Sequence, residues 1–212
     1  MSYNNELSGF VVLDIETVGC VDAGDYLSPV VPPANYKDAE KIAAWCAEKQ
    51  AERISKAAVE PDLCELVAVG WQIAGNATFC ATSEVNPEIE LLRAAWEAIN
   101  SRIIIGFYSL SFDLPVLIRR SQLLSVRFVM PNLDKYRTPH IDLFERLTFN
   151  GKITSRSLSF YCKRFAIASD DTTTGADIGS MVAAGDWAGV EAHCRADVDK
   201  TAALARRLGY LR

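Results

Sequence analysis

The sequence contains no apolar stretch long enough to cross a bilayer. Its longest uninterrupted apolar run is six residues, 42–47, whereas a membrane-spanning helix needs about 20. It also has no Lys or Arg before Lys37. The start therefore lacks the basic segment of a secretory signal and the Arg-rich face of a transit peptide. We expect a cytoplasmic protein that does not contact a membrane.

Closely spaced cysteines are absent as well. The six cysteines lie at least sixteen positions apart, so they form none of the short Cys-x-x-Cys pairs that zinc sites use. We expect them to be reduced, with most of them in the core.

The 212 residues are 50% hydrophobic and 23% charged, which is enough apolar material for a large core and too much for a disordered chain. A chain of this length predicts a single domain over 1–212. Residues 1–106 hold 7 basic and 16 acidic side chains, whereas 107–212 hold 15 and 11. This asymmetry indicates either a basic face in the second half or a patternless solvated surface.

Strand and helix patterns alternate along the chain. Residues 9–16 are apolar on both faces, which is typical of a buried central strand. Residues 66–74 and 77–82 resemble a hairpin around Gly75-Asn76. The other expected elements are strands over 102–107 and 140–143 and helices over 86–99, 112–124, 157–165, 175–184 and 186–208. They predict an α/β fold with a mixed five-stranded sheet and helices on both faces.

Residues 18–62 interrupt this alternation. A proline-rich loop over 26–35 precedes a strongly helical segment, 38–58, whose apolar positions lie on one side. We predict a helical insertion after the first strand. It is either a packing helix on the flank of the domain or a flap beside the functional site.

Two acidic residues alternate on the first strand. Asp14 and Glu16 leave the same face of that strand, about 7 Å apart. Burying two unpaired carboxylates costs several kcal/mol each. Either a divalent cation such as Mg²⁺ or Mn²⁺ pairs with them, or they lie at a solvated end of the strand.

Two later segments carry further chemistry. Asp113 begins a helix after the strand 102–107, so it lies near the carboxyl end of the sheet or is a first-turn carboxylate favoured by the helix dipole. His193 and Asp197 are four residues apart on one helix face, as a functional pair or as a helix-stabilising ion pair. Asp142 is either a fifth carboxylate beside these acids or a residue of a strand end or turn.

Together these segments resemble the three motifs of the DEDD (DnaQ-like) superfamily of 3′→5′ exonucleases, which have the ribonuclease-H-like fold. The matching residues are Asp-Ile-Glu-Thr at 14–17, Gly-Phe-Tyr-Ser-Leu-Ser-Phe-Asp-Leu-Pro at 106–115 and His-Cys-Arg-Ala-Asp-Val at 193–198. The chain looks most like the proofreading exonuclease domains of family B DNA polymerases and their stand-alone phage and prophage relatives. Residues 175–187, with Gly-Ala-Asp-Ile and Ala-Ala-Gly-Asp-Trp, support that subgroup.

The resemblance implies an enzyme that removes nucleotides from the 3′ end of DNA by two-metal-ion phosphodiester hydrolysis, with Mg²⁺ or Mn²⁺. Asp14 would bridge both ions, Glu16 and Asp197 would hold the ion that carries the attacking water, and Asp113 would support the second ion. His193 would take a proton from that water or orient it. The implied partners are single-stranded DNA or a primer 3′ end, and a DNA polymerase in trans.

Several residues are expected around the substrate. Thr17, Tyr108 and Phe112 would hold the terminal nucleotide, with Phe112 stacking on a base or acting as an ordinary core aromatic. If the insertion is a flap, Tyr36 and Lys37 would contact a base and a phosphate. Five basic residues between positions 119 and 137 form either a phosphate-tracking surface or a solvated face.

The sequence departs from the family pattern at two positions. Tyr108 replaces a common Asn, which alters a contact to the primer-strand end. His193 has the spacing of the Tyr-x-x-x-Asp branch, so it is either a general base in a different register or a hydrogen-bonding substitute that only orients water. Two alternatives to the DNA exonuclease stay open: an RNA-trimming 3′→5′ exoribonuclease and a catalytically silent nucleic-acid-binding module.

Overall fold

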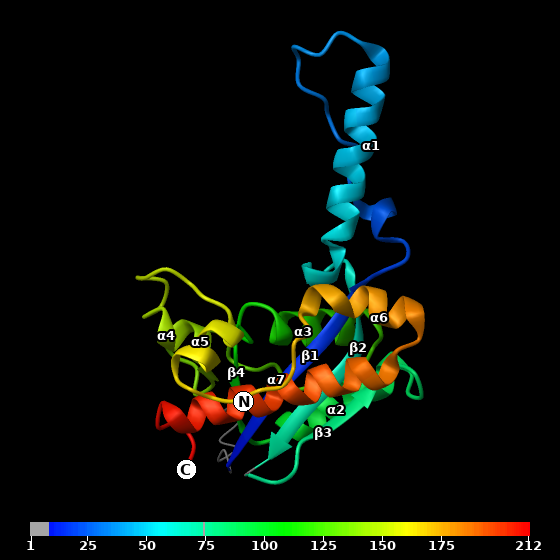
Figure 1. The fold of residues 1–212 in the computed structure, drawn as a ribbon. Coiled ribbons are helices and arrows are strands. Elements are labelled where there is room, and N and C mark those ends of the chain that lie inside the picture. Colours follow the sequence, from blue (N-terminus) through cyan, green and yellow to red (C-terminus); the bar gives the residue numbers. More distant parts are fainter. Residues whose placement is uncertain (1–8, 74) are drawn as a thin grey trace.

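In the computed structural model, residues 9–73 and 75–212 are described, and they form a five-stranded mixed sheet with the strand order β3-β2-β1-β4-β5 (Figure 1). β1 pairs antiparallel with β2 and parallel with β4, while β2–β3 is antiparallel and β4–β5 is parallel. The strands are β1 (Phe10–Gly19), β2 (Cys64–Ile73), β3 (Phe79–Thr82), β4 (Ile103–Gly106) and β5 (Ile141–Asp142). The predicted α/β fold with a central first strand is confirmed.

Helices cover both faces of this sheet. α2 and α3 pack on one face, and α5 and α7 pack on the other (Figure 1). The helices are α1 (Ala39–Ser55), α2 (Glu88–Ile99), α3 (Asp113–Leu123), α4 (Leu143–Leu147), α5 (Leu158–Arg164), α6 (Ile178–Ala184) and α7 (Trp187–Arg207), with short 3-10 turns at η1 (Ala23–Tyr26), η2 (Ala57–Val59) and η3 (Gly175–Asp177).

Alternation along β1 decides which side chains reach which face. Val11, Leu13 and Ile15 are buried in the core that the sheet forms with α2 and α3. Val12 packs on the opposite side, in the core that includes α5 and α7. Asp14 and Glu16 have the same parity as Val12, so their carboxylates lie on the face covered by α7.

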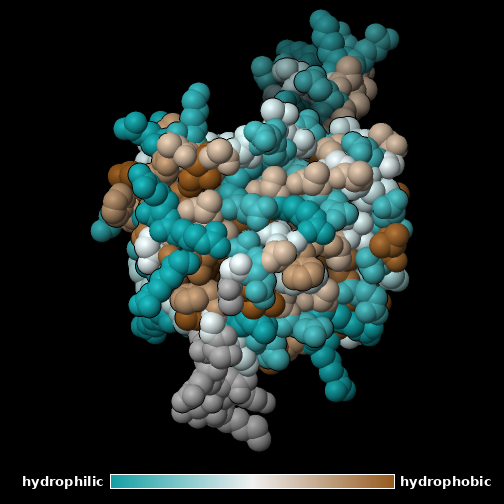
Figure 2. All heavy atoms as spheres, turned by 60° about the horizontal axis from the view of Figure 1, so that its bottom comes forward, coloured by the Kyte–Doolittle hydropathy of each residue, from teal (hydrophilic) through white to brown (hydrophobic). Residues whose placement is uncertain are grey.

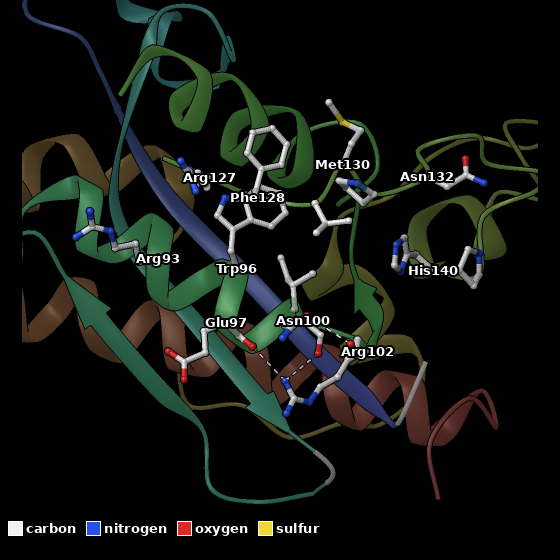
Figure 3. Close-up of a pocket in the computed structure, with 15 residues that line it drawn as sticks. Arg93, Trp96, Glu97, Asn100, Arg102, Arg127, Phe128, Met130, Asn132 and His140 are labelled. Carbon is white, nitrogen blue, oxygen red and sulfur yellow. Dashed lines mark hydrogen bonds between the residues drawn. The ribbon is translucent and has the colours of Figure 1, made fainter. Parts of the chain in front are cut away.

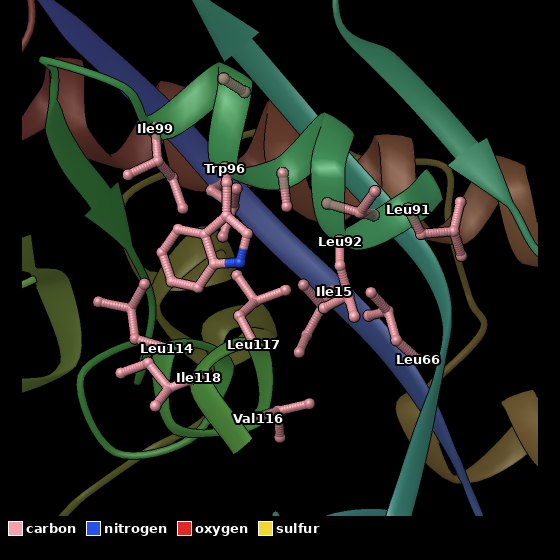
Figure 4. Packing of buried hydrophobic residues seen from close by; sticks show 14 of the residues in the cluster. Ile15, Leu66, Leu91, Leu92, Trp96, Ile99, Leu114, Val116, Leu117 and Ile118 are labelled. Atoms are coloured by element: carbon pink, nitrogen blue, oxygen red, sulfur yellow. The ribbon is translucent and has the colours of Figure 1, made fainter. Parts of the chain in front are cut away.

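Trp96 of α2 lies at the centre of the larger core (Figure 4). Its side chain is buried, and its indole N–H donates to Oγ of Ser121 at 2.7 Å. In Figure 4 the ring lies among Ile99, Leu114 and Leu117. Replacing such a residue by Ala costs about 3–5 kcal/mol. This packing holds β1, and therefore the acids on its other face, in a fixed position.

The predicted strand and helix boundaries agree with the structure to within three residues, but two details differ. Asn76 N–H donates to the Ile73 carbonyl, so a turn does form, but strand pairing resumes only between Trp71 and Phe79. The hairpin connection is therefore longer than the predicted two-residue turn. β5 is shorter than predicted because Asp142 caps α4 directly after it.

The helical insertion is an arm that projects from the rest of the molecule (Figure 1). No residue of α1 is buried, and its 17 residues extend about 25 Å at 1.5 Å per residue. At the base of the arm, Cys20 N–H donates to the Leu63 carbonyl at 2.8 Å and Ala57 is fully buried. The insertion is thus as predicted, but the interpretation as a packing helix is wrong because the domain core covers no face of α1.

All six cysteines are free thiols in the structure, and three of them, Cys64, Cys162 and Cys194, are buried. Half of the cysteines, rather than most, therefore lie in the core. In the described part of the chain, no helix is both long and apolar enough to cross a membrane. The face drawn in Figure 2 is largely hydrophilic, with its apolar side chains scattered rather than gathered in one large patch.

Candidate active site

Asp14 and Glu16 are the first members of an acidic group beneath α7. Asp14 is half-buried, and Glu16 is 6% exposed. The pairing of β1 with β2 shifts just after Glu16, which is a way of redirecting side chains at the end of a strand. Beyond the shift, Oγ1 of Thr17 donates to the Ala58 carbonyl at 2.6 Å. The hydroxyl proton of Thr17 is therefore engaged with the base of the arm, and only its lone pairs are left for a nucleotide.

Asp113 joins this group from the connection between β4 and α3. It is the first residue of α3 and is 4% exposed. A Cβ on Gly106, the last residue of β4, would lie 2.4 Å from Cβ and Oγ of Ser109. Only glycine lets the chain fold back so closely at this point. Asp113 thus lies beyond the carboxyl end of β4, where the sequence analysis expected it.

Asp142 supports the same connection from β5. Its carboxylate accepts hydrogen bonds from the backbone N–H groups of Tyr108 at 2.9 Å and Leu110 at 3.0 Å. It also accepts from the N–H groups of Phe144 and Glu145 at the start of α4. Four backbone N–H groups thus donate to the buried carboxylate of Asp142. Because its oxygens are engaged in this way, Asp142 is a turn residue and not a fifth carboxylate of the acidic group.

α7 brings His193 and Asp197 over β1. A Cβ on Gly70, which pairs with Asp14, would lie 2.9 Å from Cys194 Sγ and Val198 Cγ2 of α7. The missing side chain at Gly70 therefore allows the helix to lie close to the sheet. His193 is 4% exposed, and its Nε2 lies 3.7 Å from Oε1 of Glu16.

Burial and mutual repulsion raise the pKa values of the acids. Burial is the largest cause for Asp14, and repulsion from Asp113, Glu16 and Asp197 adds to it. The pKa of Glu16 is raised by burial, then by Asp197 and Asp113. The pKa of Asp113 is raised to about 8, again chiefly by burial. Among the described residues, no Lys or Arg forms an ion pair with Asp14, Glu16 or Asp113.

Two residues of this site escaped the sequence analysis, Asp171 and Lys200. Oδ2 of Asp171 lies 2.8 Å from Nδ1 of His193 and 2.7 Å from Nζ of Lys200. Nζ of Lys200 also donates to Oδ1 of Asp197 at 2.6 Å. Lys200 had a usable signal, because it follows His193 and Asp197 at helical spacing on one face of α7. Asp171 had none, since it lies in an irregular segment.

Cys194 also lies beside Asp14 and Glu16, with potential ligand atoms of all three within 4.8 Å of one another. Its pKa is raised well above its usual value by the hydrogen bond with Cys80, by burial and by the nearby carboxylates. The neutral thiol is a poor metal ligand, and Mg²⁺ and Mn²⁺ prefer oxygen to sulfur. Cys194 is therefore a packing residue between α7 and the sheet.

The residues expected to hold substrate lie in two separate places. Tyr108 is 45% exposed on the connection before α3, and its ring meets that of Phe144 edge-on at 4.8 Å. Phe112 is half-buried and packs against the larger core. Tyr36 and Lys37 precede α1 at the far end of the arm, a helix length from its base. The structure does not bring these two residues to the acids.

The five basic residues between 119 and 137 do not form one phosphate-tracking surface. Arg120 is largely buried and pairs with Glu88. Three more have acidic neighbours: Arg119 has Asp62, Lys135 has Glu145, and Arg137 has Asp134.

The fifth basic residue, Arg127, lines a cavity of about 750 Å³ between α2 and the loop that follows α3 (Figure 3). Trp96, Phe128 and His140 also line this cavity. None of the acids of the site does, so the cavity is separate from the acidic group.

Comparison with known proteins agrees with this geometry. A family described as predicted 3′→5′ exonucleases related to the exonuclease domain of PolB matches residues 63–212. The matched region contains Asp113, His193 and Asp197, whereas Asp14 and Glu16 precede it. No curated protein matches the chain.

The fold is similar to part of the family B DNA polymerase from the hyperthermophilic archaeon Pyrobaculum calidifontis, with a TM-score of 0.61 and 14% sequence identity. The similarity covers 94% of this chain and 24% of the polymerase chain, so the chain spans about a quarter of that protein. This likeness shows the fold. On the family match over most of its length, the chain belongs to the family of predicted 3′→5′ exonucleases related to the exonuclease domain of PolB.

Proposed function

We propose that this protein is a metal-dependent exonuclease that removes nucleotides from the 3′ end of single-stranded DNA. The observation that carries the proposal is a group of four acids that β1, α3 and α7 bring together. These acids are Asp14, Glu16, Asp113 and Asp197. Membership of a predicted exonuclease family supports the reaction.

The donor set fits Mg²⁺ or Mn²⁺, because both prefer carboxylate oxygens. The raised pKa values of Asp14, Glu16 and Asp113 indicate a place where a further positive charge is favourable. Lys200 lowers the pKa of Asp14 in part, but among the described residues no Lys or Arg forms an ion pair with these three acids. These three acids and Asp197 would hold two ions. When bound, such ions lower the pKa of the attacking water and stabilise the charge on the leaving 3′ oxygen.

His193 is the residue that we expect to act on the attacking water beside the acids. Its Nε2 faces Glu16 in a nearly water-free position. From there the imidazole accepts a proton from the attacking water or orients that water by a hydrogen bond. Lys200 neutralises part of the charge of Asp197 from the outer side of the group.

Aromatic side chains support a single-stranded substrate. Every base has a face that stacks on an aromatic ring, so Tyr108 and Phe112 would hold a 3′ end without regard to sequence. Since Tyr36 and Lys37 directly precede α1, at the end of that helix away from the base of the arm, we place them against the strand upstream of the terminal nucleotide.

The test uses one oligonucleotide sequence as DNA and as RNA, labelled at the 5′ or the 3′ end, with Mg²⁺, Mn²⁺ or EDTA. We expect immediate release of the 3′ label as a mononucleotide from DNA, gradual shortening of 5′-labelled DNA, and no reaction in EDTA. Faster degradation of RNA would favour the exoribonuclease alternative. Binding of the oligonucleotide and of Mn²⁺ without hydrolysis would favour the silent module.

A further inference from the structure

A continuous line of polar side chains, most of them buried, runs behind the acidic group. It passes from Asp197 through Lys200 and Asp171 to His193, which faces Glu16. The side chains of His193, Lys200 and Asp171 are 4%, 6% and 10% exposed. The family motifs contain His193 and Asp197, but the segment that carries Asp171 lies outside all three motifs.

The donor of the hydrogen bond between Asp171 and His193 follows from charge. The ammonium group of Lys200 donates to Oδ2 of Asp171 at 2.7 Å, and this charge-assisted hydrogen bond favours the ionised carboxylate. An ionised carboxylate only accepts hydrogen bonds. At 2.8 Å, Nδ1 of His193 must therefore carry the hydrogen. A neutral imidazole has one N–H, so Nε2 is then left with its lone pair.

Lys200 keeps Asp171 in the position that this bond needs. The irregular segment 167–174 is largely exposed, and with α7 it borders a cavity of about 600 Å³ instead of packing tightly against the helix. The neighbours Asp170 and Thr172 are exposed, whereas Asp171 reaches inward. An ammonium group only donates, so Lys200 ties Asp171 to Asp197 through two charge-assisted hydrogen bonds.

We propose that Asp171 is a positioning residue that holds His193 in the Nδ1–H tautomer, with the lone pair of Nε2 directed toward Glu16. The catalytic meaning of this role rests on the proposed exonuclease function. The tautomer itself is a property of the free protein and is measured without substrate or metal.

The second histidine of the chain is an internal reference. The two histidines are His140 and His193. Nδ1 of His140 accepts a hydrogen bond from the backbone N–H of Ile104 at 3.1 Å, so a neutral His140 carries its hydrogen on Nε2. The structure therefore assigns opposite tautomers to the two rings.

Nitrogen NMR of ¹⁵N-histidine-labelled protein in EDTA, at alkaline pH where imidazoles are neutral, tests this directly. The signals are assigned with His193→Gln. We expect Nδ1–H for His193 and Nε2–H for His140. In Asp171→Ala, His193 should lose its Nδ1–H preference while His140 is unchanged, which shows that the fold is intact. Asp171→Asn should keep the wild-type tautomer because an amide oxygen also accepts, and Asp170→Ala is the matched control.

Kinetics supply the second readout. Asp171→Ala should lower kcat by about 10- to 100-fold, the range seen for partners that orient functional histidines, with little change in KM. Asp171→Asn should retain most of kcat. An Nε2–H tautomer of His193 in the wild type, or an unchanged tautomer in Asp171→Ala, would overturn the inference. Expected tautomers in a protein that hydrolyses nothing would instead overturn the proposed function alone.

Discussion

Nε2 of His193 lies 3.7 Å from Oε1 of Glu16, and both side chains are almost completely buried. The distance is too long for a hydrogen bond, so the two groups face one another across a narrow space. The last helix and the first strand thus place an imidazole beside the acids. Substitution of His193 therefore tests whether this ring transfers a proton or only orients water.

His193→Ala should lower turnover by about 10²- to 10⁴-fold if the imidazole takes a proton from water, since that is the usual contribution of a general base. His193→Tyr restores the Tyr-x-x-x-Asp pattern at the same spacing, and it should retain or increase activity if the ring only orients water. Initial rates on single-stranded DNA, measured with both Mg²⁺ and Mn²⁺, distinguish the two roles. Full activity in both variants would remove His193 from the reaction.

Asp14→Asn should weaken Mn²⁺ binding without harming the fold. The substitution removes a carboxylate that its acidic neighbours repel, so the metal-free protein should be as stable as the wild type or more stable. Calorimetric titration with Mn²⁺ and thermal melting in EDTA measure the two effects. Glu84→Gln is the control, because Glu84 is an exposed acid in the connection between β3 and α2 and is not part of the acidic group. Wild-type Mn²⁺ affinity in Asp14→Asn would contradict the metal assignment.

The metal-free protein should lose stability as Asp113 ionises. The pKa of Asp113 is raised to about 8 in the folded chain, against about 3.9 when unfolded. The folded state therefore binds more protons between these values, and the free energy of unfolding falls as pH rises through that window. Burial lowers the pKa of His140, which gives the opposite slope near pH 6.

Because His140 contributes an opposite slope in both proteins, urea unfolding in EDTA should be compared between wild type and Asp113→Asn at about pH 5 and pH 8. The stability of the wild type relative to Asp113→Asn should decrease with pH. Mn²⁺ added at the higher pH should restore the wild type, because it binds the folded state. If the stability of the wild type relative to Asp113→Asn rose with pH instead, the folded protein would not disfavour the ionised form of Asp113.

The arm should affect substrate binding more than turnover. Replacing both Tyr36 and Lys37 by Ala removes one aromatic face and one positive charge from its tip, so KM for long single-stranded DNA should rise while kcat changes little. The control is the double Ala variant of Lys135 and Tyr136, another adjacent Lys–Tyr pair, of which Tyr136 is exposed and Lys135 is half-buried. An unchanged KM would leave the arm without a role in holding DNA.

The sequence predicted the sheet and the main acids because their signals are local. Alternation along β1 and helical spacing in α7 place Asp14, Glu16, His193 and Asp197 without any knowledge of distant contacts. The position of Asp171 depends on an irregular segment that folds back to α7, and no periodicity marks such a contact.

The arm illustrates a second limit. The sequence predicts an apolar side for α1, but a pattern does not say what covers it, and in the structure only part of that side, including Ile42 and Cys46, is half-buried. In the structure the proline-rich loop of the arm itself runs along the helix: Cys46 Sγ lies 3.6 Å from the Val30 carbonyl, and Arg53 donates to the Ser28 carbonyl at 2.6 Å. The helix therefore needs no support from the domain core.

Tyr108 shows why a departure from the family pattern is hard to interpret from sequence. Its φ is +66°, a left-handed conformation in which Asn is several times more frequent than bulky residues. The left-handed backbone at this position would suit an Asn, and this chain adopts it with a Tyr. The Tyr108 N–H bond to Asp142 and the contact with Phe144 hold it there.

The most direct test of the central claim is the initial rate of mononucleotide release from the 3′ end of single-stranded DNA, measured against Mn²⁺ concentration for wild type, Asp14→Asn and Glu84→Gln. The account predicts a rate that saturates with Mn²⁺ in the wild type and in Glu84→Gln. In Asp14→Asn it predicts a rate lower by at least about 10³-fold at every concentration, because the ligand shared by the proposed ions is lost. Release by Asp14→Asn at the wild-type rate, or release from the 5′ end, would contradict it.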